Sequence, residues 1–286
     1  MITIMGASGR VGGAVLEVVS QTGQPVRALS RNPPAETRPN VEWRAVEARD
    51  SAALAAAFDG SDAVFVMNPI AAGAEDVTRE AAQLSAAVAQ ALRQASISYA
   101  VALSSQGAHL AGGTGIVTTL HDFEMALRDT PTRIAVLRPA MFMESWIPLA
   151  GIGADTGAMP AFLAPLDRAI EAVSAIDVGR AAGQLLLSPR PGIFNLTGPR
   201  RYSERDAAAI LSRHAGRAIS ADPVPEQEIA AFHMAAGLGA SFSEGIAGMY
   251  MALNRDGIPF SGDGAQSLSC ETPLETVLAP VVAQPV

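Results

Sequence analysis

Two hydrophobic patterns alternate along the first half of the chain. Short apolar runs typical of buried strands occur at 2–5, 24–30, 41–46, 62–67, 98–105 and 132–139. Segments with apolar residues at helical spacing lie between them, at 10–23, 51–60, 75–96 and 121–130. For the helix at 51–60 we expect Ser51 as the N-cap. Strands that alternate with helices of this length predict βαβ units and a parallel sheet.

After Pro139 the pattern becomes less regular. A helix is predicted over 175–187, a strand and turn over 192–199, and two further helices over 203–216 and 225–237. Ser203 suits the N-cap of the third of these segments, and Gly216 suits its end. We find no repeat and no long linker, so these pieces predict a smaller lobe over the sheet rather than an independent domain.

Composition narrows the classes of function. The net charge of −8 argues against general nucleic-acid binding, which needs clustered basic residues. One cysteine, Cys270, excludes an intrachain disulfide, and no apolar run reaches the ~20 residues of a membrane span. The chain opens without a signal-peptide pattern, so we expect a cytoplasmic protein that avoids membranes. The four histidines are scattered, and no metal site is predicted.

The first strand is followed by a glycine-rich loop with the spacing GxxGxxG. Gly6 permits a tight turn, Gly9 lets a diphosphate approach the backbone, and Gly12 permits close packing of helix on sheet. The helix that begins after this loop offers unpaired N–H groups to the phosphates. The position of the motif predicts a dinucleotide site on a Rossmann-type sheet rather than an ordinary strand–helix turn.

The end of the second strand distinguishes between cofactors. An acidic residue there binds the ribose hydroxyls of NAD, but this chain has Ser30, Arg31 and Asn32. Arg31 offers a fork of donors to a 2′-phosphate, and Arg10 in the glycine loop can assist. We therefore predict NADPH/NADP+ as the cofactor; the alternative is that Arg31 is a solvated loop residue.

An ordered set of segments resembles one known family. MITIMGASGRVGGAVLEVV, VRALSRNP, DAVFVMNP, VALSSQGA, HDFEMALRDT, IAVLRPAMFMESW, SAIDVGRAAGQLL and IFNLTGP are similar to segments of the NmrA-like branch of the atypical short-chain dehydrogenase/reductases. The resemblance implies an α/β fold with a Rossmann-type doubly wound parallel sheet and a small C-terminal α/β substrate lobe. We place the core at roughly 1–150 and the lobe mainly at 151–286, within one unit covering 1–286.

The resemblance also implies roles by position. Around the phosphates it places Gly6, Ser8, Gly9, Arg10, Val11 and Gly12. Ser30 and Arg31 would hold the adenosine end, and Glu47 loosely matches an acid that faces adenine. Met67, Asn68 and Pro69 would run beneath the ribose and nicotinamide, and Ser104 and Ser105 would end beside the nicotinamide.

The catalytic pair of standard short-chain dehydrogenases is missing. That pair is a tyrosine and a lysine four residues apart, and the chain contains no lysine. His121 is a candidate proton donor or ribose ligand, or else a helix-surface or hydrogen-bonded histidine. Ser104 and Ser105 are candidates to orient a substrate carbonyl or the nicotinamide amide, or else they only terminate a strand.

Apolar residues follow the sixth predicted strand. Met141, Phe142, Met143 and Trp146 suit an adaptable substrate pocket, with core packing as the competing interpretation. We favour an NADPH-dependent reductase of a small apolar, quinone-like or other conjugated or carbonyl substrate, acting by hydride transfer without a Tyr/Lys pair. The alternatives are a non-catalytic NADP(H)-sensing regulator and a non-redox isomerase or cyclase. The oligomeric state, monomer or homodimer, stays open.

Overall fold

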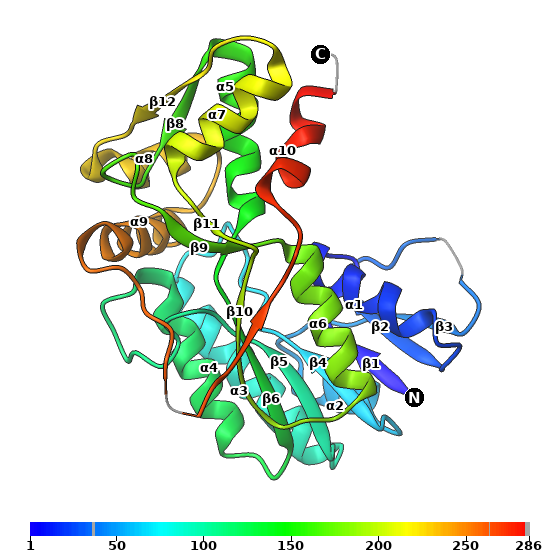
Figure 1. Cartoon of the computed structure of the whole chain (residues 1–286). Helices are drawn as coiled ribbons and strands as arrows, with labels where there is room; N and C mark the ends of the chain where they lie inside the picture. Colours follow the sequence, from blue (N-terminus) through cyan, green and yellow to red (C-terminus); the bar gives the residue numbers. More distant parts are fainter. Residues whose placement is uncertain (36–37, 263, 284–286) are drawn as a thin grey trace.

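The computed structural model describes residues 1–35, 38–262 and 264–283. Its centre is an eight-stranded sheet in the order β13-β10-β6-β5-β4-β1-β2-β3, in which every neighbouring pair is parallel (Figure 1). The strands are β1 (Ile2–Ile4), β2 (Val26–Ser30), β3 (Val41–Ala45), β4 (Ala63–Val66), β5 (Tyr99–Leu103), β6 (Arg133–Pro139), β10 (Gly192–Thr197) and β13 (Gln266–Ser269). The strand order reverses between β1 and β4, so the predicted doubly wound parallel sheet is confirmed.

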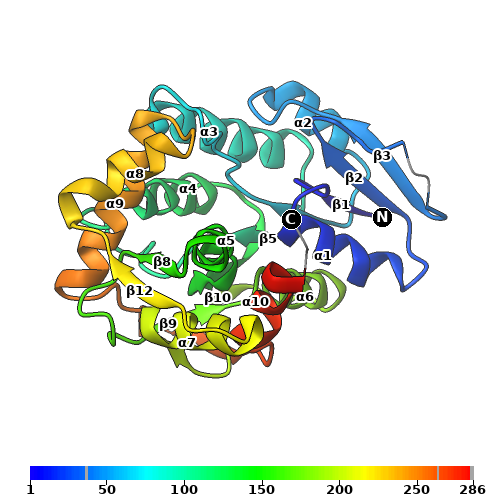
Figure 2. The same ribbon diagram turned by 90° about the horizontal axis from the view of Figure 1, so that it is seen from above.

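Helices cover both faces of this sheet, as Figure 2 shows from above. One face carries α1 (Arg10–Ser20) and α6 (Ala175–Leu187), and the other carries α2 (Ser51–Phe58), α3 (Val77–Gln94) and α4 (Thr118–Arg128). Alternate residues of β4 show the two faces: Phe65 packs under α1 and α6, and Val64 packs under α2 and α3. Burial on both faces explains why these strands are continuously apolar.

Helices α1 and α6 lie unusually close together. A Cβ on Gly179 would lie 2.4 Å from the Cβ of Ala14, and one on Gly183 would lie 2.8 Å from the Cβ of Val18. The two glycines of α6 therefore let the helix backbones approach, which holds α1 firmly against the sheet. The predicted bounds of this helix, 175–187, agree with the structure.

The lobe lies above the carboxyl ends of the strands and has its own core (Figure 1). Its helices are α5 (Ile147–Thr156), α7 (Glu204–Ala215), α8 (Ile229–Ala235), α9 (Ala240–Arg255) and α10 (Leu274–Ala283). Two small sheets join them, β8–β12 and β7–β9–β11. Their strands are β7 (Met141–Phe142), β8 (Ala158–Ala161), β9 (Ile170–Val173), β11 (Arg201–Tyr202) and β12 (Ser220–Pro223).

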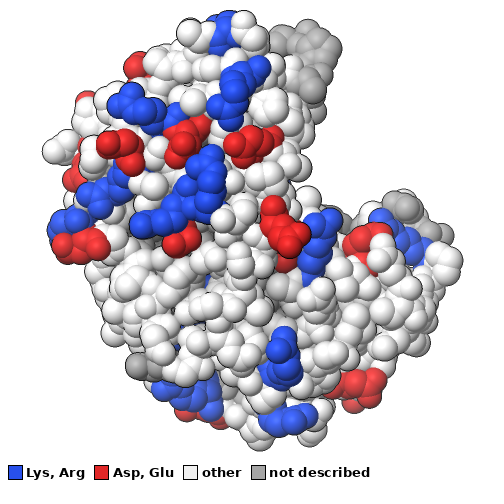
Figure 3. All heavy atoms as spheres, in the orientation of Figure 1, with Lys and Arg blue, Asp and Glu red and all other residues white. Residues whose placement is uncertain are grey.

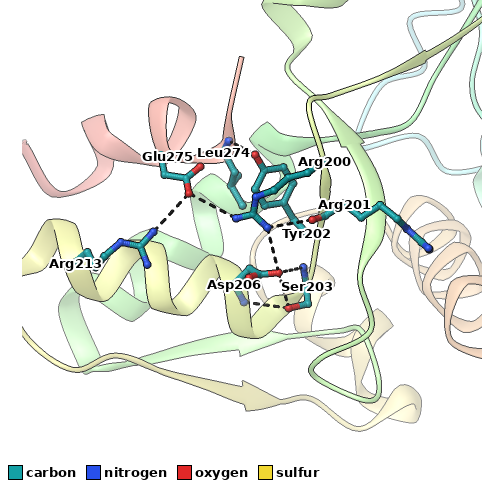
Figure 4. A network of polar contacts seen from close by, with 8 residues as sticks. All are labelled: Arg200, Arg201, Tyr202, Ser203, Asp206, Arg213, Leu274 and Glu275. Atoms are coloured by element: carbon teal, nitrogen blue, oxygen red, sulfur yellow. Dashed lines mark hydrogen bonds and ion pairs between the residues drawn. The ribbon is translucent and has the colours of Figure 1, made fainter. Parts of the chain in front are cut away.

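Polar contacts attach α10 to α7 (Figure 4). Glu275 forms ion pairs with Arg200 at 3.6 Å and with Arg213 at 3.5 Å, and Arg200 lies over the ring of Tyr202. The backbone N–H of Leu274 donates to the Tyr202 hydroxyl at 3.1 Å. Over the face seen in Figure 3, charged side chains of both signs gather on the lobe, and much of the core below it is uncharged.

The large sheet is not built from one continuous stretch of sequence. Strands β10 and β13 come from beyond residue 150, and so does helix α6. The chain leaves the core after β6 and returns to it twice, so residues beyond 150 contribute to the core as well as to the lobe, and the division into roughly 1–150 and mainly 151–286 stays a prediction. Periodicity identifies a strand but not the sheet that the strand joins.

Two helix ends test the expected caps. Ser203 caps α7 in a reciprocal arrangement with Asp206, and Gly216 ends it with φ +64°, as predicted. The N-cap expected at Ser51 is wrong. Asp50 takes that place, because its carboxylate accepts from the N–H groups of Ala52 and Ala53 at 3.0 and 2.9 Å.

Candidate functional site

The glycine loop makes a tight turn between β1 and α1. Gly6 has φ +64°, and the Gly9 N–H donates to its carbonyl oxygen at 2.9 Å. A Cβ on Gly12 would lie 2.2 Å from that same carbonyl oxygen, so only glycine fits there. The Ala7 N–H donates to Leu29 of β2 at 3.0 Å, which fixes the loop over the sheet.

The start of α1 is suited to an anion. Gly9 is its N-cap, and within the described residues no side chain caps this end and no acid lies in the first turn. The N–H groups of this turn are therefore left for a ligand, and the helix dipole places partial positive charge there.

One cavity, of about 350 Å³, lies on the β2 side of the loop. Gly6, Ser8 and Gly9 line it together with Ser30, Arg31 and Asn32, which stand at and just after the end of β2. The Ser8 and Ser30 hydroxyls are 2.7 Å apart, and the Asn32 N–H donates to the Ser30 hydroxyl at 3.2 Å. Met67, Pro69, Val46, Glu47, Ala48 and Arg49 complete much of its wall.

A second cavity, of about 310 Å³, continues on the other side of the same loop. Gly6, Gly9 and Met67 line both cavities, so the two form one groove that crosses the glycine loop. Its further walls are Leu103 at the end of β5, Phe142 of β7, and the start of α6 at Ala175. Arg10, Val11 and Gly12 line this side as well.

The loop after β4 forms the floor between the two halves. The Asn68 amide nitrogen donates to the Ala81 carbonyl at 3.0 Å and to the Ser85 hydroxyl at 2.9 Å. These bonds hold the loop against α3. The amide oxygen of Asn68 is buried and has no hydrogen-bond partner among the described residues.

The three candidate catalytic side chains do not gather at the groove. Ser104 is buried and donates to Glu124 at 2.5 Å, and Ser105 donates to the Gln106 carbonyl at 3.1 Å. The Nδ1 atom of His121 lies 3.0 Å from the Ala108 carbonyl oxygen, so this nitrogen carries a proton and donates. None of the three lines either cavity.

The tyrosines are also engaged elsewhere. The Tyr99 hydroxyl bonds to the backbone of Arg190, at 3.4 Å to its oxygen and 3.2 Å to its nitrogen. Tyr202 and Tyr250 are buried in the lobe, where burial raises the pKa of the Tyr250 hydroxyl far above its ordinary value. No tyrosine lines the groove as far as the structure describes it.

The four apolar candidates divide into two groups. Met141 and Phe142 are half-buried, and Phe142 lines the second cavity. Met143 and Trp146 are buried in the core of the lobe, where the Trp146 indole N–H donates to Glu204 at 2.7 Å. Neither residue lines one of the two cavities described above. Both belong to a short 3-10 helix, η2 (Met143–Trp146), in which they are the buried residues.

The same short helix places two residues at the groove that we did not predict. Glu144 and Ser145 line the second cavity. The Glu144 carboxylate accepts from the Ser174 hydroxyl at 3.1 Å and from the Ala175 N–H at 3.0 Å. A lone Glu in an apolar segment was the available signal, since a carboxylate there needs polar partners.

Across the described ranges, no three His, Cys, Asp or Glu side chains come close enough together to hold a metal ion. Within those same ranges, no helix combines the length and the apolar character needed to cross a membrane.

Two proteins with named activities are similar in sequence to this chain. The NAD(P)H azoreductase of Xenophilus azovorans is 26% identical, with 77% of this chain and 75% of that protein covered. A (4-alkanoyl-5-oxo-2,5-dihydrofuran-3-yl)methyl phosphate reductase of Streptomyces griseus subsp. griseus is 31% identical over 230 residues, with 77% and 75% covered.

Solved structures share the fold. The Citrobacter sp. triphenylmethane reductase superposes with a TM-score of 0.81 at 21% identity, covering 99% of both chains. The NADPH-dependent quinone oxidoreductase of Escherichia coli, complexed with NADPH, gives 0.77 at 20% identity and covers 100% of this chain and 95% of that one. The model of the NmrA-like family matches residues 1–258, and this chain therefore belongs to the NmrA-like family.

Proposed function

We propose that this chain is an NADPH-dependent reductase that acts on a small, apolar, conjugated substrate, with quinones as the first class to test. The observation that carries the proposal is the groove that crosses the glycine loop, with Arg31 at one end and Phe142 at the other. The groove runs along the carboxyl ends of β2, β1, β4 and β5, where sheets of this kind bind dinucleotides.

The residues present fit NADPH. The uncapped first turn of α1 would bind the diphosphate, and the space that Gly9 leaves admits it. Arg31 would pair with the 2′-phosphate, since no acid at the end of β2 opposes that charge. Leu103, Met67 and Phe142 would enclose the nicotinamide half. When bound, the reduced cofactor supplies a hydride.

The lining of the second cavity supports an apolar acceptor. Val11, Met67, Leu103 and Phe142 are half of the residues that contribute side chains to this lining, and the cavity volume lies at the lower end for small-molecule sites. The related proteins are named for azo, quinone and triphenylmethane substrates, all of which are conjugated acceptors. By analogy, a flat conjugated molecule suits this cavity.

The position of the side chains also favours acceptors that need little acid catalysis. The chain has no lysine, and neither a tyrosine nor His121 belongs to the described lining of the groove. Quinones accept a hydride readily, and water can supply the proton to the reduced oxygen. The task of the chain is then to orient the two reactants and exclude competing water.

Calorimetric titration with NADPH, NADP⁺ and NADH tests the cofactor assignment. A charge-assisted contact to the 2′-phosphate is worth about 1.5–3 kcal/mol, so Arg31→Ala should lose most of the preference for NADPH over NADH. Arg44→Ala is the control, because Arg44 is an exposed strand residue paired with Glu42 and lies outside the groove. Failure of the wild type to bind any of the three would refute the proposal.

Turnover with a naphthoquinone then separates the reductase from its alternatives. Oxidation of NADPH that depends on the quinone supports the reductase. Cofactor binding without turnover of any conjugated acceptor would favour a redox sensor. Product formed while NADPH stays constant would favour a non-redox enzyme on the same fold.

A further inference from the structure

The carboxylate of Glu144 is one of two charged groups among the described residues that line the second cavity. The other is Arg10, which stands at the start of α1 beside the proposed diphosphate site. The remaining lining is glycine, alanine, one serine and apolar side chains. A charge next to such a lining is screened less than one in water.

Hydrogen bonds hold this carboxylate in place. Oε1 accepts from the Ser174 hydroxyl at 3.1 Å and from the Ala175 N–H at 3.0 Å, and Oε2 lies 3.0 Å from the same N–H. In the described part of the chain, no ion pair joins Glu144 to an arginine. Its negative charge is therefore stabilised by dipoles at the start of α6, and the carboxylate is in direct contact with no described cation.

Capping α6 does not by itself account for this arrangement. Ser174 already caps the helix, since its hydroxyl accepts from the Ile176 N–H at 3.3 Å. Glu144 adds a full charge and brings it from another element, η2, to the wall of the groove. Figure 1 shows that α6 begins where the lobe meets the core, above the sheet.

We propose that Glu144 makes the site favour the oxidised cofactor over the reduced one. The inference rests on the proposed function. The two forms carry the same phosphates, but the nicotinamide ring bears a positive charge only when oxidised. A fixed carboxylate in that half of the groove attracts the charged ring and leaves the neutral ring unaffected.

This preference assists hydride donation. Loss of a hydride, with its two electrons, converts the neutral ring into the cationic one, while the acceptor gains the hydride and takes a proton from water. By linkage, the factor by which the site prefers the oxidised form is also the factor by which it favours donation. Glu144 is therefore a residue that tunes the cofactor and is not itself a proton donor.

Glu144→Gln tests the proposal because it removes the charge and keeps one oxygen that can accept from Ala175. The readout is the ratio of Kd for NADP⁺ to Kd for NADPH, measured by calorimetry without substrate. We expect this ratio to rise roughly three- to tenfold. Glu144→Asp, which retains the charge, should stay closer to wild type.

Glu47→Gln is the matched control. Glu47 lines the cavity at the other end of the groove, so its neutralisation should change the affinities for both forms by the same factor. An unchanged ratio in a folded Glu144→Gln variant, or an equal rise in Glu47→Gln, overturns the inference. Failure of wild type to bind either form refutes the proposed function instead.

A measurement on the wild type covers the case in which the variants do not fold. 2′-Phospho-ADP-ribose carries the same adenosine end but no nicotinamide. We expect NADP⁺ to bind more tightly than this fragment. The affinity of NADPH should exceed that of the fragment by a smaller factor. A larger gain for NADPH than for NADP⁺ overturns the inference.

Discussion

The guanidinium of Arg138 and the carboxylate of Glu124 form a two-point ion pair in the interior of the core. Nε donates to Oε1 at 2.8 Å and Nη2 to Oε2 at 2.5 Å, and both residues are less than a tenth exposed. Ser104 donates to the same carboxylate, and Arg138 also donates to the Ser261 hydroxyl at 2.7 Å. One pair thus joins β5, α4, β6 and the segment before β13.

Removal of one partner of this pair should destabilise the fold strongly. Glu124→Ala leaves a buried guanidinium without its counter-charge, and we expect a loss of about 3–5 kcal/mol in the free energy of unfolding. Urea denaturation followed by circular dichroism measures it. The control is Glu275→Ala in the exposed network of Figure 4, expected to cost about 0–1 kcal/mol. Equal losses in the two variants would contradict the argument.

Two adjacent glycines of the phosphate loop should respond differently to alanine. A Cβ on Gly12 would lie 2.2 Å from the backbone oxygen of Gly6, whereas one on Gly13 would meet its nearest neighbour at 3.5 Å. Gly12→Ala should therefore displace the loop and weaken NADPH binding by tenfold or more. Gly13→Ala should keep the affinity and add about 0.5–1 kcal/mol of helix stability. Calorimetry and thermal unfolding test both, and tight binding by Gly12→Ala would refute the steric account.

Glu204 should make stability depend on pH. Its carboxylate is buried and accepts from the Trp146 indole and from the Phe162 and Leu163 N–H groups. Burial raises its pKa above 4.5, although these three donors act in the opposite direction.

The sign of the effect follows from linkage. The folded state holds this proton more tightly than the unfolded state, so the contribution of Glu204 is largest below pH 4.5 and decreases as pH rises through the folded pKa. The unfolding free energy of wild type minus that of Glu204→Gln should therefore decrease as pH rises over this range. Urea denaturation at a series of pH values measures it; a difference that grows with pH would be inconsistent with a raised pKa.

Cys270 should be a slow nucleophile. Burial, with a smaller contribution from the negative charge of Asp177, raises the pKa of its thiol to about 11. Because the thiolate is the reactive form, alkylation by iodoacetamide should accelerate about tenfold per pH unit from pH 7 to 10. The chain has one cysteine, so mass spectrometry gives a single signal. Asp177→Asn should react faster, and a rate independent of pH would exclude the raised pKa.

Features encoded by neighbouring residues were predictable from the sequence. The glycine loop, the bounds of α6 and the caps at Ser203 and Gly216 each depend on backbone sterics or on side chains within a few positions. Apolar periodicity likewise predicts the buried strands, because alternate residues must face the helices on the two sides of the sheet. The missing lysine is a fact of composition and excludes the standard catalytic pair without a structure.

Features that depend on distant contacts required the tertiary structure. The sequence pattern could not assign β10 and β13 to the large sheet, or tell Phe142 at the groove from Trp146 in the core. Ser104 was expected beside the nicotinamide, but its hydroxyl is bound to Glu124, twenty residues away in the chain. The Glu144 carboxylate is held by hydrogen bonds from Ser174 and Ala175, thirty and thirty-one residues further on. Such pairings depend on how the elements pack, because a polar side chain in the interior bonds to the group that packing places within its reach.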